Sequence, residues 1–175
     1  MSDLALDIDS LNAAVARLYS EDLAVSLDFA GDVHQRWQAE YRAGQLINSA
    51  LLLTARLKDG TALLKQRIEG KPLCINGQPN NQSDIVQSMF FSVYIEKIQP
   101  YMSTVTQGRV ALIEPFEQLA EMQRAVMPES FAGWYERHLS QSAEASLWRE
   151  LDVAMMAHTK AWQELLGQCG LRPGA

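Results

Sequence analysis

The chain has 175 residues, of which 47% are hydrophobic, and a formal net charge of −6. This length and composition suit one domain with an apolar core, and they exclude global disorder. The negative charge argues against a general nucleic-acid binder, because neutralising phosphates requires a cationic surface.

Membrane insertion and secretion are not expected. No apolar run approaches the roughly 20 residues that cross a bilayer. The chain opens with Met1-Ser2-Asp3, whereas a signal peptide opens with basic residues. Two cysteines, Cys74 and Cys169, do not make a disulfide framework. We therefore expect a cytoplasmic protein with no membrane partner and with reduced thiols.

Charge is distributed unevenly along the chain. Residues 1–32 hold seven acidic side chains against Arg17, and residues 33–71 hold seven basic side chains against three acidic ones. The simplest interpretation is that the acidic N-terminal segment packs near the basic middle. Alternatively, basic residues of the middle segment face an acidic partner or a phosphate, the candidates being Arg56, Lys58, Lys65, Arg67 and Lys71.

The first 69 residues are predicted to be helical. Asp9-Ser10 is a plausible N-cap, and Asp32 caps a second helix with an apolar stripe over residues 33–54. Gly44 lies on this stripe and would let a neighbouring helix approach closely. Asp59-Gly60 predicts a helix stop, followed by a short helix. A hairpin about Asp59-Gly60 is a competing prediction that the apolar spacing disfavours.

Residues 70–83 cannot be helix, because Pro72 and Pro79 remove backbone donors. Asn76-Gly77 favours a turn with positive φ angles, so a small hairpin is possible here. Long loops on a rigid scaffold are often recognition surfaces.

The second half of the chain returns to helical spacing. A helix is expected from Ser83-Asp84, and Pro100 would end or kink it. Residues 101–114 favour helix over a short hairpin. Pro115 and Pro128 suit the first turns of two further helices. The last helix is the clearest, and it is expected from about Ser142 to Gly167 or Gly170. The sequence therefore predicts one all-α domain over residues 1–175, an irregular bundle of five to seven helices with one long loop.

The motifs of common catalytic chemistry are missing. None of the three histidines has a good ligand three or four residues away, which disfavours helical metal sites. Phosphate-binding glycine loops and the Gly-x-Ser-x-Gly motif are absent. We predict no catalytic residue, no metal and no cofactor.

His158 lies inside an apolar stripe of the last helix. The simplest interpretation is a hydrogen-bonded core residue, whose burial would keep the imidazole neutral. As an alternative function, His158, Trp162 and a neighbour such as Tyr94 would form a pocket between helices for a small ligand or a substrate.

The favoured prediction is a small intracellular binding module, acting as an adaptor, regulator or inhibitor. It would dock a protein with an acidic or neutral patch. Self-association is a related prediction, because the helix expected at 84–99 has a wide apolar arc. Cys74 is expected to be exposed. The predicted partner-binding residues lie in and beside the loop: Lys65, Arg67, Lys71, Cys74, Asn76, Asn80 and Asn81.

Overall fold

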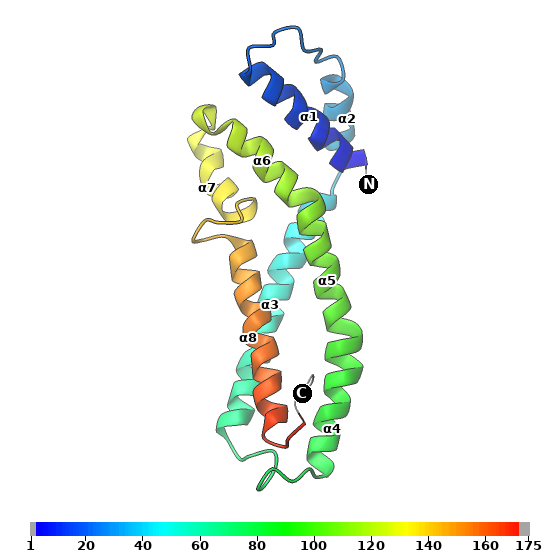
Figure 1. The fold of residues 1–175 in the computed structure, drawn as a ribbon, viewed down its shortest axis with the longest axis vertical. Coiled ribbons are helices and arrows are strands. Elements are labelled where there is room, and N and C mark those ends of the chain that lie inside the picture. The colour runs from blue at the N-terminus through cyan, green and yellow to red at the C-terminus, as the bar shows by residue number, and fades with distance from the viewer. Residues whose placement is uncertain (1–2, 172–175) are drawn as a thin grey trace. The chain divides into compact units, whose positions relative to one another are not determined.

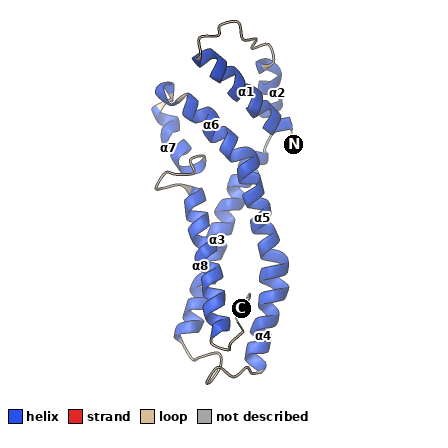
Figure 2. Ribbon diagram, viewed as in Figure 1, coloured by secondary structure: helices blue, strands red, loops and turns tan. Residues whose placement is uncertain are grey.

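The computed structural model describes residues 3–171, and the described chain is helical (Figures 1 and 2). Two π-helical segments, η1 (Phe90–Ile98) and η2 (Arg109–Ile113), join three α-helices into one continuous run over residues 81–122. A short 3-10 segment, η3 (Arg124–Val126), follows. The α-helices are α1 (Asp3–Tyr19), α2 (Ala30–Gln38), α3 (Arg42–Glu69), α4 (Asn81–Met89), α5 (Gln99–Gly108), α6 (Glu114–Met122), α7 (Glu129–His138) and α8 (Leu147–Gly167).

The predicted fold class is confirmed. Counting the run over residues 81–122 once gives six helices among residues 3–171, within the expected five to seven. The described residues form two compact units. Unit 1 comprises residues 3–49 and 105–149, and unit 2 comprises residues 50–104 and 150–171. Whether the chain folds as a single domain stays a prediction.

In unit 1, α1 packs against α6 and η2. Leu4, Ile8 and Leu112 form a buried apolar cluster there. Since Leu4 and Ile8 extend the apolar face of the first helix toward its start, α1 begins at Asp3 and not near the predicted cap at Ser10. Asp7 accepts hydrogen bonds from Arg36 of α2, with Nε 3.0 Å from Oδ2. This ion pair agrees with an acidic N-terminal segment that packs near basic residues.

The predicted helix stop at Asp59-Gly60 is wrong, because α3 continues through both residues. Gly60 has a packing role instead. A Cβ atom built on Gly60 would lie 2.9 Å from Cε1 of His158 on α8. The missing side chain lets the imidazole lie directly against the backbone of α3, which accounts for a glycine in the middle of a helix despite its propensity cost.

Residues 101–114 are helical, so the favoured interpretation is confirmed and the hairpin alternative is wrong. Pro100 does not end the helical run. It is the second residue of α5, after Gln99 and close to the end of η1, so its missing N–H lies near the point where the hydrogen-bond register of the helix changes. Pro115 likewise continues the run, in the first turn of α6.

The predicted non-helical loop exists, but it is shorter than expected and ends at Asn80. Asn76 and Gly77 have φ angles of 54° and 71°, and one antiparallel bridge joins Ile75 to Gln78. The small hairpin is therefore present in its minimal form. The Asn80 side chain caps α4 by accepting from the backbone N–H groups of Gln82 and Ser83.

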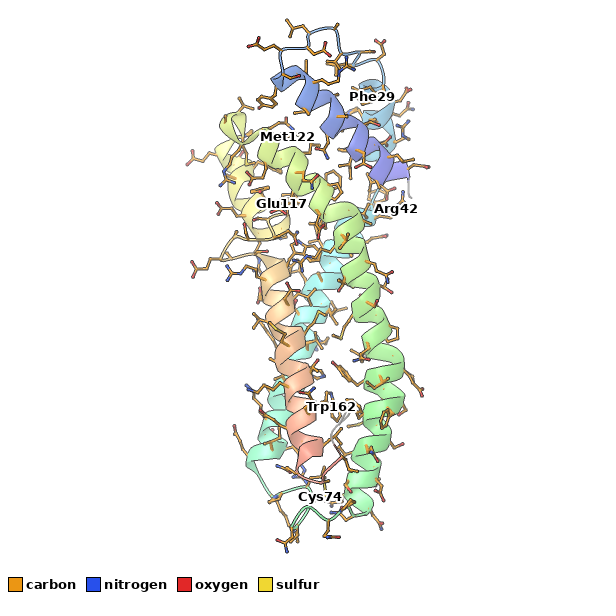
Figure 3. The ribbon with its side chains drawn as sticks, in the orientation of Figure 1. Phe29, Arg42, Cys74, Glu117, Met122 and Trp162 are labelled. Carbon is orange, nitrogen blue, oxygen red and sulfur yellow. A yellow bond between two sulfur atoms is a disulfide. The ribbon has the colours of Figure 1, made fainter. Side chains whose placement is uncertain are left out.

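The expectation of reduced, exposed thiols is wrong. Cys74 and Cys169 form a disulfide in unit 2, with Cα atoms 5.2 Å apart, and both residues are at least 95% buried. Cys74 therefore lies inside the loop and joins it to the end of α8 (Figure 3). Spacing alone did not predict the pairing, because the two cysteines are 95 residues apart.

The disulfide is expected to stabilise the fold substantially. The double variant C74A/C169A should lose roughly 2–5 kcal/mol of unfolding free energy, since the bond closes a long loop in the unfolded chain. Urea unfolding of the variant and of the wild type measures the difference. Wild-type protein in excess reductant should match the variant, and equal midpoints for all three samples would contradict the prediction.

Candidate functional site

The three side chains of the predicted His158 pocket do come together in unit 2. The Tyr94 ring centroid lies 5.2 Å from that of His158 and 6.1 Å from that of Trp162. All three residues are buried. Tyr94 also forms a hydrogen bond through its hydroxyl with Thr159, at 2.8 Å.

Both nitrogens of His158 have partners inside unit 2. The indole Nε1 of Trp162 lies 3.1 Å from Nε2 of His158. An indole N–H only donates, so Nε2 accepts and the imidazole proton lies on Nδ1. Nδ1 lies 3.2 Å from the Thr61 hydroxyl oxygen, which itself donates to the backbone carbonyl of Leu57.

This arrangement fits a neutral, structural histidine. Burial lowers the pKa of His158 below its ordinary value of 6.5, and the nearby Leu57 carbonyl opposes this effect more weakly. Because both ring nitrogens are used internally, neither is left to contact a ligand. The pocket function predicted for these residues stays a prediction, and the geometry favours the core interpretation.

Most of the predicted partner-binding residues have structural contacts. Arg67 donates to the backbone carbonyl of Lys71, and the Asn80 amide donates to the carbonyl of Leu73. Asn76 holds the left-handed turn. Lys65, Lys71 and Asn81 are exposed, so a binding role for them stays a prediction.

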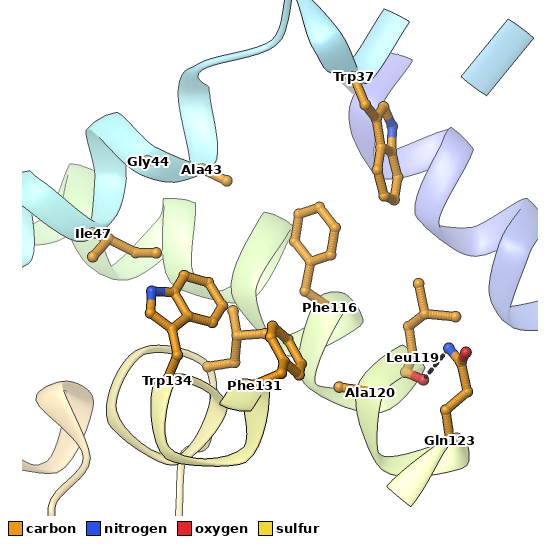
Figure 4. A pocket seen from close by; sticks show the side chains of 11 residues that line it. Trp37, Ala43, Gly44, Ile47, Phe116, Leu119, Ala120, Gln123, Phe131 and Trp134 are labelled. Atoms are coloured by element: carbon orange, nitrogen blue, oxygen red, sulfur yellow. Dashed lines mark hydrogen bonds between the residues drawn. The ribbon is translucent and has the colours of Figure 1, made fainter. Parts of the chain in front are cut away.

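A cavity that the sequence did not reveal lies in unit 1, and we call it the aromatic groove. It has a volume of about 400 Å³. Figure 4 shows its four aromatic side chains, which come from α2, α6 and α7. None of its described lining residues carries a charge. Apart from the indole N–H groups of the two tryptophans, the side chain of Gln123 is the polar group among them. The lining consists of Trp37, Ala43, Gly44, Ile47, Phe116, Leu119, Ala120, Gln123, Phe131, Trp134 and Leu139.

Polar contacts hold α7 and the segment after it against α6. The buried Tyr135 hydroxyl donates to Glu121, and Glu117 accepts from the backbone N–H of Gln141 at 2.7 Å. Glu117 is labelled on α6 in Figure 3. Burial, together with the bond to Glu121, raises the pKa of Tyr135 to about 12, so the hydroxyl keeps its proton at neutral pH.

Gly44 opens one wall of the groove. Apart from its chain neighbours and the backbone of its own helix, no atom lies within 4 Å of the position where its Cβ would be. The expected close approach of a neighbouring helix is therefore wrong, because this face of the glycine meets open space. The sequence did place Trp37, Gly44 and Ile47 on one stripe, and that stripe was the available signal. It could not show which apolar positions would lack a packing partner.

Within residues 3–171, no group of three or more histidine, cysteine, aspartate or glutamate side chains could hold a metal ion. Over the same residues, no helix combines the length and the hydropathy that crossing a membrane requires.

The buried His158 predicts an acid-sensitive stability. Its pKa in the folded chain lies below 6.5, so the unfolded chain binds the proton first as the pH falls. The stability contribution of neutral His158 is complete above pH 6.5 and is lost as the pH approaches the lowered pKa. One such group gives a slope of at most about 1.4 kcal/mol per pH unit.

Urea unfolding at several pH values between 7.5 and 5 measures this slope. His158→Gln should flatten it, whereas His34→Gln, at an exposed position, should leave it unchanged. A wild-type slope that survives His158→Gln would show that another group titrates.

Comparison with known proteins identifies a family, but that family has no described activity or ligand. No curated protein and no solved structure matches the chain. Residues 1–173 match the family described as "Protein of unknown function (DUF3080)". Since the match covers nearly the whole sequence, the chain belongs to this family.

Proposed function

We propose that the chain is a helical binding module that holds a small, uncharged apolar ligand in the aromatic groove. The observation that carries the proposal is the groove itself, a cavity of about 400 Å³ in unit 1 lined almost entirely by apolar and aromatic side chains. Pockets for small ligands usually have volumes of about 300–1,000 Å³ and a mostly apolar lining.

The lining favours a ligand without charge. Moving an ion into such a groove would cost its hydration with no opposite charge to compensate. A peptide segment is also disfavoured, because its amides need hydrogen-bond partners. The Gln123 amide is the exception in the lining, and it already donates to the carbonyl of Leu119 at 3.0 Å.

The expected affinity is modest. Burying about 300 Å² of apolar ligand surface gains about 6–10 kcal/mol. The loss of translational and rotational freedom costs about 4 kcal/mol or more, so we expect Kd values no tighter than about 40 µM.

Filling the groove should abolish binding. Gly44→Leu places a side chain in the open space beside Gly44, and it should weaken binding of the neutral fluorescent probe N-phenyl-1-naphthylamine by at least about tenfold. Probe fluorescence titrated against protein concentration measures this change.

Gly133→Leu is the matched control. Gly133 also faces open space on a helix, but it does not line the groove. Both substitutions replace a helical glycine and should raise the unfolding free energy by up to about 1 kcal/mol, so unfolding cannot explain a difference between them. Equal probe affinity in the two variants would overturn the proposal.

Cellular location is a separate proposal. The expected cytoplasmic location rested partly on reduced thiols, and the disulfide of Cys74 removes that support. Because structural disulfides persist mainly in oxidising compartments, an oxidising compartment is favoured. Thiol alkylation in intact host cells tests this: modification of both cysteines without added reductant would contradict it.

Protein docking by the loop remains a second proposal, and one observation favours it. Ile75 is 71% exposed on a hairpin, where it pairs across the turn with Gln78, three residues later. The neighbouring Cys74 is fixed by the disulfide. An apolar side chain held at a fixed tip, with Lys71 nearby in sequence, suits a neutral or acidic partner surface. Equal recovery of partners by wild type and by the variant K71A/I75S would contradict this role.

A further inference from the structure

We propose that the ligand of the aromatic groove is a flat aromatic ring system, and that the groove selects it over a saturated molecule of the same size. This inference rests on the proposed function, because it names the ligand class of the same site. It depends on how the four aromatic side chains of the groove are arranged.

The rings of the groove already pair in both geometries that aromatic groups favour. Trp37 and Phe116 meet edge to face, with centroids 5.2 Å apart and planes at 68°. Phe131 and Trp134 stack, with centroids 5.4 Å apart and planes at 29°. A ligand ring can extend either pair, by presenting its edge to a ring face or its face to a ring edge.

The second pair is accessible from solvent. Phe131 is 36% exposed and Trp134 is 44% exposed, although both line the groove. The stack continues on α7 to His138, whose ring centroid lies 5.1 Å from that of Trp134. Exposed aromatic rings beside an apolar cavity are typical of positions where a ligand supplies the missing contact.

Small residues line part of the groove. Ala43, Gly44 and Ala120 contribute one side-chain carbon or none to the lining. Long aliphatic side chains at these three positions, like those of Ile47, Leu119 and Leu139 elsewhere in the lining, would fill part of the groove. The small residues therefore leave space in which a flat ring can lie against the aromatic rings.

Simple burial of apolar area does not predict the same selectivity. A saturated bicyclic compound exposes at least as much apolar surface as its aromatic counterpart, so area alone would let it bind equally well or better. A preference for the aromatic compound therefore reports ring–ring contacts and not general hydrophobicity.

The test compares 2-naphthol with decahydro-2-naphthol, two uncharged compounds with the same carbon skeleton. Each displaces N-phenyl-1-naphthylamine from the full chain, and the displacement curves give the ratio of their Kd values. We expect 2-naphthol to bind about tenfold more tightly. A ratio near one, or a preference for the saturated compound, overturns the ring proposal while the proposed apolar groove stands.

Absence of probe binding would overturn the proposed function and the ring proposal together. Trp134→Leu removes one ring face and keeps an apolar side chain at a partly exposed position. This variant should bring the ratio of Kd values toward one while its urea midpoint stays close to that of the wild type. If the variant keeps the tenfold ratio, the assignment of selectivity to this aromatic wall is wrong.

Discussion

The hydrogen bond from the buried Tyr135 hydroxyl to Glu121 joins α7 to α6, and these two helices carry three of the four rings of the aromatic groove. A cavity between helices removes apolar packing where it lies, so contacts beside it must hold the helices in place. The Glu117 carboxylate, which accepts from the backbone N–H of Gln141, is a second polar attachment. Burial and the bond to Glu121 raise the pKa of Tyr135 to about 12 from an ordinary value of 10.0, at which the donor is already protonated at neutral pH.

Two aromatic clusters, one in each unit, are arranged differently. In unit 2, Tyr94 and Trp162 surround His158, and the polar atoms of all three are satisfied within the unit. This is the arrangement of a core, in which buried polar groups find internal partners. In unit 1, Phe131 and Trp134 stack on each other but remain partly exposed beside open volume. Binding is therefore better sought in unit 1.

The sequence predicted the fold class because helical periodicity is local, whereas the candidate site depends on contacts between distant segments. Asn76-Gly77 carries its turn signal in two residues. Gly44, on its apolar stripe, predicts a close helix contact, and Asp59-Gly60 predicts a helix stop, yet Gly60 lies against an imidazole and Gly44 faces open space. The surroundings of both glycines are set by segments far away in the sequence. The pairing of Cys74 with Cys169 was missed for the same reason.

The disulfide also affects how the chain would respond to a protease. Cys74 and Cys169 are separated by 95 of the 175 residues, so more than half of the backbone lies inside a covalent ring. A single cut anywhere in that ring would leave both pieces joined, and the mass of the molecule would rise only by that of one water until the disulfide is reduced. A nicked molecule would thus keep its helices tethered at high local concentration, and cleavage would not by itself separate the segments that build either unit.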